Sequence, residues 1–312
     1  MASGKPSCYR CRNPAYTRVP GATTLICRKC YSTGIVDRVR RTINRYQMFH
    51  DGDVIAVGLS GGKDSTVLLH ILSQLEKSHP SSSLTAIAID EGIHGYRDEA
   101  IKYAQRAAEK AAVELYLVSF EELFGYTLDE LALRLTNANS SKKPCAICGN
   151  LRRYALNRVA RGFGATKLAT GHNLDDEAQT CILNMLRGDL FRFRRLSRKP
   201  MQKHPQLVPR VKPLVELTER EIQLYALAKE IQYHDFECPY ALTAMRNDVR
   251  SFLATQEEKR AGTLITILRF HDRLVAQKNG EMGPRFKPCK KCGEPTSTET
   301  CSACKILEKL GS

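Results

Sequence analysis

The sequence of 312 residues lacks any long run of apolar residues. A membrane-spanning helix needs about 20 predominantly apolar residues, so the absence excludes such a segment and any role inside a bilayer. The first five residues, Met-Ala-Ser-Gly-Lys, are polar and lack the apolar region of a signal peptide. No repeat with a period of about 20–50 residues is visible. We therefore expect a cytoplasmic protein with one main domain and appendages.

Acidic residues are few relative to basic ones. The chain has 33 Asp and Glu against 48 Lys and Arg, which gives a net charge of +15. A basic surface can serve solubility alone, so a solvated face without a partner is one interpretation. An excess of this size also matches a polyanionic partner such as RNA, and we favour that interpretation.

Cysteine is abundant, with 12 residues, and in a cytoplasmic chain this indicates metal or redox chemistry rather than disulfides. Two pairs of Cys-x2-Cys knuckles lie near the ends of the chain, and two knuckles together close a tetrahedral zinc site. We predict one Zn²⁺ in each set, with unligated thiols as the alternative. The expected domains are a zinc lobe at 1–33, a catalytic domain at 34–280 and a second zinc lobe at 281–312. The two sets comprise Cys8, Cys11, Cys27 and Cys30, and Cys289, Cys292, Cys301 and Cys304.

Residues 54–72 predict a strand, a tight glycine turn and the start of a helix. Backbone N–H groups and the positive end of the helix dipole form a phosphate cradle in such a turn. The turn is not a Walker A loop, because three residues separate Gly58 from Gly62 and Asp64 replaces the hydroxyl residue after Lys63. A glycine turn without a ligand is the alternative. The predicted nucleotide-binding residues are Gly58, Leu59, Ser60, Gly61, Gly62, Lys63, Asp64 and Ser65.

Strand and helix patterns alternate through the middle of the chain, which predicts an α/β domain with a parallel sheet. Helical stretches are expected at 98–112, at 121–134 and after residue 151. The strand at 84–90 ends with Ile89 and Asp90, a position where acidic residues commonly bound the ribose or base of a nucleotide. We therefore expect the active site at the carboxyl edge of the sheet.

Two adjacent carboxylates, Asp175 and Asp176, follow a predicted strand that ends at Gly171 and His172. Such a pair suits Mg²⁺ binding or general acid–base chemistry. The alternative is that the carboxylates cap the helix that follows. Cys181, inside that helix, is interpreted as a core residue.

Three further cysteines have no zinc spacing. Cys145 and Cys148 stand at the start of a predicted helix, where a thiol pKa is expected to fall, and Cys238 lies far along the chain. A redox or persulfide-carrying dithiol is one interpretation, and three ligands of an iron–sulfur cluster are another. Unligated thiols are the third.

Residues 187–199 place two Phe residues among six basic ones. Basic side chains can follow phosphates while aromatic rings stack on unpaired bases, so we favour RNA contact for this segment. A flexible basic loop with a hydrophobic anchor is the alternative.

Together these motifs resemble one family along most of the chain: the tRNA 2-thiouridine synthetases with paired terminal zinc lobes. The loop at 60–65, the three central cysteines, the segment 171–178 and both terminal sets occur in the order of that family. Residues 90–98 and 184–189 look like the wobble-uridine branch, and the TtuA branch, which acts on the T-loop uridine, is the alternative. TtuA-like members carry a lysine where this chain has Arg152. An arginine can hold phosphate but does not readily release a proton.

The resemblance implies a parallel, five-stranded sheet of adenine-nucleotide α-hydrolase (PP-loop) type with helices on both faces, in an enzyme that uses ATP and Mg²⁺. It implies a 4Fe–4S cluster on Cys145, Cys148 and Cys238, with one iron left open for sulfur. The implied reaction adenylates the C2 oxygen of a tRNA uridine and replaces that oxygen with sulfur, from sulfide or from a ubiquitin-like carrier. The candidate catalytic residues are Lys63, Asp64, Cys145, Arg152, Asp175, Asp176 and Cys238.

Other hypotheses stay open from the sequence alone. A persulfide on Cys145 or Cys238 could deliver sulfur without a cluster. The ATP loop could serve another acceptor, as in amidating or lysine-attaching relatives, which do not need the central cysteines. A non-catalytic zinc-bearing RNA-binding module would not turn over ATP. The expected partner in our preferred hypothesis is tRNA, with a homodimer or a heteromer as the expected assembly.

Overall fold

The computed structural model describes residues 6–19, 22–138, 140, 143–200, 204–241, 244–276 and 286–311, and the structural statements below refer to these ranges. At the centre lies a five-stranded parallel sheet in the order β5-β4-β3-β6-β7. The predicted α/β class with a parallel sheet is therefore confirmed. The strands are β3 (Val54–Gly58), β4 (Ser83–Asp90), β5 (Glu114–Ser119), β6 (Lys167–Ala169) and β7 (Arg210–Val211).

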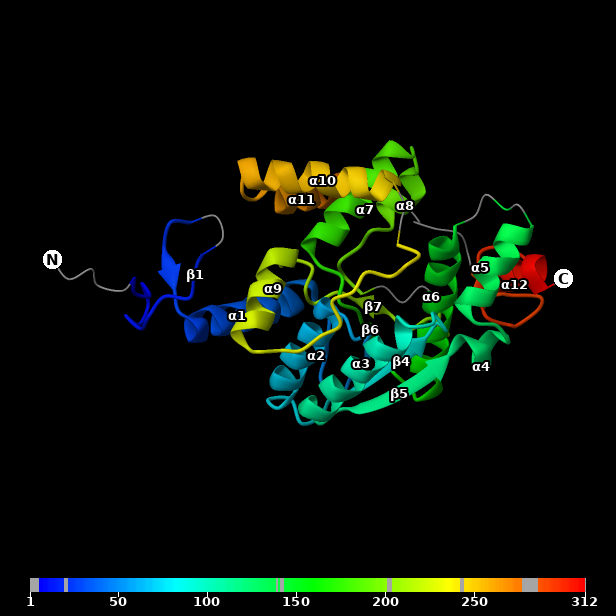
Figure 1. The fold of residues 1–312 in the computed structure, drawn as a ribbon, viewed down its shortest axis with the longest axis horizontal. Helices are drawn as coiled ribbons and strands as arrows, with labels where there is room; N and C mark the ends of the chain where they lie inside the picture. The colour runs from blue at the N-terminus through cyan, green and yellow to red at the C-terminus, as the bar shows by residue number, and fades with distance from the viewer. Residues whose placement is uncertain are drawn as a thin grey trace.

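Two cores lie on opposite faces of the sheet, because successive strand residues point to opposite sides. In β3, Ile55 and Val57 belong to one core and Ala56 to the other. The first core is covered by α1 (Arg28–Tyr46), α2 (Lys63–Glu76), α3 (Arg97–Ala111), α7 (Leu174–Leu186) and α9 (Glu219–Ala228). The second is covered by α4 (Phe120–Phe124), α5 (Leu128–Asn137), α6 (Pro144–Gly162) and α12 (Ser302–Gly311), as Figure 1 shows.

Two further helices, α10 (Ala244–Lys259) and α11 (Thr263–Ala276), pack on the outer side of α7. None of the helices in the described ranges combines the length and the apolar character that crossing a bilayer requires. Cys181 in α7 is 2% exposed, so its predicted place in the core is confirmed.

The strand order brings three loops to one edge of the sheet. β3 lies between β4 and β6, and all three strands run in the same direction. The loops that follow them therefore meet at the carboxyl edge, next to the point where the chain crosses from one side of β3 to the other. Open α/β sheets bind ligands in this crevice.

The cysteine lobes lie at opposite ends of the molecule (Figure 1). In the N-terminal lobe, β1 (Thr17–Arg18) pairs with β2 (Leu25–Ile26), and α1 then runs without a break through residue 33, where the sequence suggested a boundary. In the C-terminal lobe, β8 (Lys287–Pro288) pairs with β9 (Pro295–Thr296), and α12 packs against α5 and α6. This second lobe is part of the core on the α6 face.

The single helix expected at 121–134 is wrong. Gly125, with φ of 75°, ends α4, and capping boxes at Ser119 and Thr127 begin α4 and α5 separately. A left-handed glycine stops a helix, and a capping threonine starts the next one, so local turn chemistry overrides the helical pattern.

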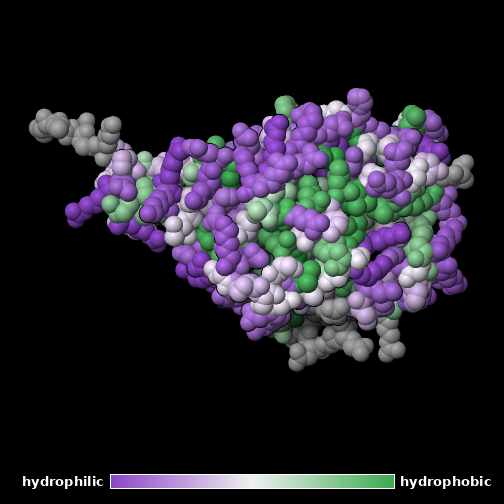
Figure 2. Space-filling model, turned by 90° about the horizontal axis from the view of Figure 1, so that it is seen from below, coloured by the Kyte–Doolittle hydropathy of each residue, from purple (hydrophilic) through white to green (hydrophobic). Residues whose placement is uncertain are grey.

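Strand β5 forms one edge of the sheet, and apolar side chains on both of its faces are partly exposed. Tyr116 and Leu117 are 38% and 43% exposed, and the Tyr116 ring stacks on Phe163 with centroids 5.2 Å apart. Figure 2, seen from below, shows hydrophobic residues gathered over this side of the molecule. An edge strand with exposed apolar side chains is typical of contact with another protein.

Candidate active site at the carboxyl edge of the sheet

A cavity of about 230 Å³ lies at the carboxyl ends of β3, β4 and β6. Most of the nucleotide-binding residues named from the sequence line it. Gly61, Gly62 and Lys63 belong to the same turn without being part of the lining. The lining includes Gly58, Leu59, Ser60, Asp64, Ser65, Ile89, Arg152, Gly171, His172 and Asp176.

The glycine turn is held in place by its own hydroxyl groups. Ser65 Oγ accepts a hydrogen bond from Ser60 N (3.1 Å) and donates one to Gly62 O (3.0 Å). Gly61 has φ of +85°, and a Cβ there would lie 2.0 Å from Ala100 O, so only glycine fits. Gly62 caps α2 without a side-chain hydrogen bond, which leaves the first N–H groups of the helix free for an anion.

Gly171 lets the end of β6 approach the start of α2. A Cβ at this position would lie 2.9 Å from Ser65 N. Any larger residue would push the β6 loop away from the glycine turn. The small size of Gly171 therefore brings His172 and Asp176 to the same cavity as the turn.

Asp64 and Asp176 are half-buried carboxylates in the lining. Burial raises the pKa of Asp64 to about 7, and its Oδ1 atom is buried without a hydrogen-bond partner. Burial also raises the pKa of Asp176, which completes the capping box of α7 by accepting from Asn173 N (3.3 Å). Capping, the alternative stated above, thus holds for Asp176, which lines the cavity as well.

The raised pKa of Asp64 leads to a prediction for the stability of the metal-free protein. Its pKa of about 7 in the folded chain exceeds the ordinary 3.8, so ionisation destabilises the fold progressively as the pH rises from about 4 to 7. In EDTA, we expect Asp64→Asn to stabilise the protein at pH 8 by about 1–4 kcal/mol and to add little at pH 4. Thermal melts at both pH values measure this. An equal gain at both would contradict the assignment to ionisation.

Three other polar residues named from the sequence have different surroundings. His172 is kept neutral, because burial lowers its pKa to about 4, and its Nδ1 lies 3.0 Å from Thr170 Oγ1. Asp90 lies outside the lining and accepts from Gly92 N (2.8 Å). Asp175 also lies outside it and accepts from Glu219 N (2.8 Å).

Lys63 points to α9. Its Nζ lies 3.1 Å from Glu219 Oε1, and Arg250 of α10 contacts the same carboxylate. Glu219 therefore neutralises Lys63. A phosphate in the turn would offer Lys63 a stronger charge at short range.

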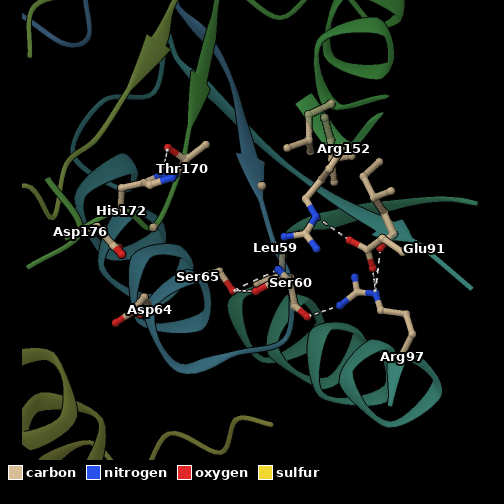
Figure 3. Close-up of a pocket in the computed structure, with 15 residues that line it drawn as sticks. Leu59, Ser60, Asp64, Ser65, Glu91, Arg97, Arg152, Thr170, His172 and Asp176 are labelled. Carbon is tan, nitrogen blue, oxygen red and sulfur yellow. Dashed lines mark hydrogen bonds and ion pairs between the residues drawn. The ribbon is translucent and has the colours of Figure 1, made fainter. Parts of the chain in front are cut away.

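The sequence analysis assigned no role to Glu91 and Arg97. In the structure, their ion pairs connect the glycine turn to Arg152 of α6 (Figure 3). Glu91 and Arg97 are nearly inaccessible to solvent, at 3% and 4%. Glu91 forms ion pairs with Arg97 (2.8 Å) and Arg152 (2.6 Å). Arg97 also donates to Ser60 O (2.6 Å) in the glycine turn. The only sequence signal for these two residues was the position of Glu91, an acidic residue beside Asp90. An arginine in a predicted helix gives no indication that its side chain is buried.

Arg152 extends this network to the central cysteines. Its Nη2 donates to Cys148 Sγ (3.3 Å). Burial alone would lower the pKa of the guanidinium, but Glu91 and Cys148 raise it, so Arg152 stays charged. A pair of arginines on one buried carboxylate thus joins the nucleotide turn to the cysteine site.

The three central cysteines gather beside the cavity. Cys145 donates to the backbone oxygen of Tyr240, two residues after Cys238, and Cys238 packs against the core that contains Cys148. Burial raises the pKa of Cys148 to about 11 and also raises that of Cys238. The lowered pKa expected for Cys148 from its place at a helix start is therefore wrong, because desolvation outweighs the helix dipole.

The spacing of these thiols differs from that of the terminal sets. In each terminal set, one Sγ atom per residue lies within 4.8 Å of the others. Four thiolates around one Zn²⁺ lie about 3.8 Å apart, since each Zn–S bond is about 2.3 Å. The central trio does not form such a close set among the described residues. A four-iron cluster binds its thiolates on different iron atoms and needs the wider spacing.

The basic segment at 187–199 contains α8 (Leu190–Arg194). Phe193 is 8% exposed and packs on the His271 ring, with centroids 4.7 Å apart. The predicted stacking on RNA is therefore wrong for Phe193, which is the hydrophobic anchor of the alternative. Phe191 remains 44% exposed.

Comparison with known proteins identifies the family. A family model described as PP-loop domain matches residues 35–257. The chain is 39% identical to cytoplasmic tRNA 2-thiolation protein 1 of Chlamydomonas reinhardtii, over 97% of this chain and 84% of that protein. The chain belongs to this family. Its member in Caenorhabditis elegans is 36% identical over 98% of this chain and 82% of that protein.

A solved structure agrees with the family assignment. The U34-tRNA thiolase NcsA from Methanococcus maripaludis, determined with its [4Fe-4S] cluster, superposes with a TM-score of 0.84. The two chains are 34% identical, and the match covers 99% of this chain and 97% of the other. The resemblance stated from the sequence motifs is thereby confirmed.

Proposed function

We propose that this chain is an ATP-dependent tRNA uridine 2-sulfurtransferase of the cytoplasm that acts on the wobble uridine. One observation supports it above all: in a chain of the tRNA 2-thiolation family, Glu91 joins the nucleotide turn to the central cysteines. An enzyme that only attaches amines to an adenylate has no use for this connection. A binding module has no use for the turn.

The proposed reaction needs both the nucleotide turn and the central cysteines. Oxide is a poor leaving group, so the C2 oxygen of uridine must first be adenylated, and AMP then leaves when sulfur attacks the ring. In the proposal, the turn at 60–65 binds the phosphates of ATP through backbone N–H groups and the serine hydroxyls. Lys63 leaves Glu219 and stabilises the charge that develops on the phosphates. Neutral His172 contributes a wall of the cavity without adding charge.

The lining fits Mg²⁺. Asp64 Oδ1 is buried and unpartnered, and the Asp176 carboxylate lines the same cavity. Hard cations prefer such oxygen ligands. Bound there, Mg²⁺ would neutralise the phosphates and remove the cost of two ionised carboxylates side by side. Asp175 is assigned a supporting role through the backbone of α9.

The donor set of Cys145, Cys148 and Cys238 fits the three-thiolate 4Fe–4S cluster. When bound, such a cluster supplies an iron without a protein ligand, to which an external sulfur source can add. Arg152 holds Cys148 by a hydrogen bond and keeps a positive charge at the boundary of the two halves. It is assigned to phosphate or thiolate stabilisation rather than proton transfer. A persulfide on Cys145 or Cys238 is the rival mechanism.

Zinc, the sulfur donor and the assembly belong to the proposal as well. The two terminal sets have the compact spacing of four-cysteine zinc sites. Sulfide or the thiocarboxylate of a ubiquitin-like carrier is the proposed sulfur source. The apolar edge at β5 supports association as a homodimer or a heteromer.

Nucleoside mass spectrometry tests the proposal. The protein is purified anaerobically and incubated with tRNA, ATP, Mg²⁺ and sulfide, and the modified nucleoside is mapped. We expect ATP-dependent 2-thiouridine at the wobble position. Thiouridine in the T-loop would instead support the TtuA branch. ATP turnover without any thiouridine would point to another acceptor.

A further inference from the structure

A second cavity, of about 650 Å³, lies between α6, α8, β7 and the C-terminal cysteine lobe. It is larger than the cavity at the glycine turn, and all but one of its charged lining residues are basic. Glu294 is the only acidic residue of its lining, and Arg161 occupies both oxygens of that carboxylate. The basic residues of the lining are Arg153, Arg192, Arg195, Lys199, Arg210 and Lys212.

Most of these cations have no counterion in the described part of the chain. Arg192 pairs with Asp189 (3.3 Å) and Lys212 with Glu177 (2.6 Å). No ion pair to a carboxylate is formed there by Arg153, Arg195, Lys199 or Arg210. Four uncompensated cations therefore face the same space, from α6, the end of α8, β7 and one loop.

Two of them, Arg153 and Arg210, have a lowered pKa, to which a neighbouring arginine contributes in each case. Burial and the neighbouring Arg153 lower the pKa of Arg210 to about 10. Burial, Arg192 and Arg152 lower the pKa of Arg153. Like charges at close range destabilise the folded chain. A cluster of cations such as this one is therefore typical of a site that binds an anionic ligand.

The second cavity adjoins the first. Arg152 and Leu156 of α6 line the cavity at the glycine turn, whereas Arg153 and Asn157, the next residues, line the basic one. Val211 accepts a backbone hydrogen bond from Thr170, which lines the first cavity, and its neighbours Arg210 and Lys212 line the second. Neighbouring residues of α6 therefore line both cavities, and β7 connects the second cavity to the end of β6 beside the first.

We propose that this basic cavity holds phosphate groups of the tRNA strand whose uridine reacts at the glycine turn. The inference rests on the proposed function and adds the place where the RNA backbone is held. The cations are spread over α6, α8, β7 and the connecting segment at Lys199, which suits successive phosphates better than one small anion. Tyr154 and Phe286 in the same lining offer rings for an unpaired base.

Arg153→Ala and Arg210→Ala test the site. Titration of fluorescent tRNA at several salt concentrations should show that the dissociation constant rises about ten-fold for each variant at ~0.15 M salt. The slope of log affinity against log salt should fall by about one for each lost phosphate contact. Because repulsion is relieved, the melting temperature of the free variants should be unchanged or higher. Arg153→Lys should restore most of the affinity.

Arg106→Ala, an exposed arginine on α3, is the matched control and should bind tRNA like the wild type. Unchanged tRNA affinity in both cavity variants would overturn the inference, as would lost affinity accompanied by a lower melting temperature. So would weakened binding of AMP or inorganic phosphate with tRNA affinity intact. A protein that binds tRNA through these arginines but forms no thiouridine would instead overturn only the proposed function.

Discussion

Replacing Lys63 with alanine should reduce tRNA thiolation by at least about 100-fold, because removal of one charge-stabilising group from a transition state has effects of this size. Lys63 is the first residue of α2 and stands beside the turn that would bind the phosphates. No other lysine of the described chain lies in that turn. The rate of 2-thiouridine formation in single-turnover reactions measures the effect, with ATP affinity determined separately. We expect tRNA affinity to remain, since the RNA is held elsewhere.

The control for Lys63→Ala is Lys77→Ala, at the other end of the same helix. Lys77 is exposed and should tolerate the change without loss of thiolation. Lys63→Arg keeps the charge but alters its geometry and should recover part of the rate. Full thiolation by Lys63→Ala would remove the nucleotide turn from the mechanism and favour a zinc-bearing RNA-binding module.

Cys145→Ala and Cys238→Ala should each abolish the iron content and lower the thiolation rate by at least about 100-fold. Two thiolates are too few to hold a cluster against loss of iron. ATP and tRNA affinities should remain close to those of the wild type, because neither cysteine lines the nucleotide cavity. Iron and sulfide analysis, the visible absorption spectrum and nucleoside mass spectrometry, all under anaerobic conditions, measure the outcome.

Cys181→Ala is the matched control for the cysteine variants. Cys181 is buried in α7, away from the trio, so its loss should cost about 1 kcal/mol of stability while iron and activity persist. A colourless, iron-free wild-type protein with full activity would eliminate the cluster and favour a persulfide on Cys145 or Cys238. Full enzymatic activity in Cys145→Ala would indicate that the ATP loop serves another acceptor, in a reaction that does not need the central cysteines.

The ion pairs of Glu91 connect the two sites that the Lys63 and cysteine variants test. A carboxylate that is 3% exposed and holds two arginines is costly to remove, since the buried guanidinium group of Arg97 would lose its counterion. The arginines in turn hold Ser60 O in the turn and Cys148 Sγ at the cysteine site. The geometry of nucleotide and sulfur chemistry is thus set by one buried charge network.

Much of the site could be predicted from residues that lie close together in the sequence. The glycine turn depends on residues adjacent in sequence, and its conformation follows from Gly61, whose φ no other residue adopts easily. The Cys-x2-Cys knuckles are likewise local, and each terminal set closes into a compact group. Alternating apolar strands and helices were sufficient for the α/β class. Boundaries were less certain, as the break at Gly125 shows.

Residue identity and local spacing, then, determined by themselves the nucleotide turn, the cysteine sets, the α/β class and the family. Contacts between distant segments were decided only by the tertiary structure: Glu91 with Arg97 and Arg152, Cys145 with the turn at Tyr240, and the basic cavity between α6 and the C-terminal lobe. The physical reason is that burial and charge pairing depend on which surfaces meet. Burial is also why Cys148 has a raised pKa at a helix start that would otherwise lower it.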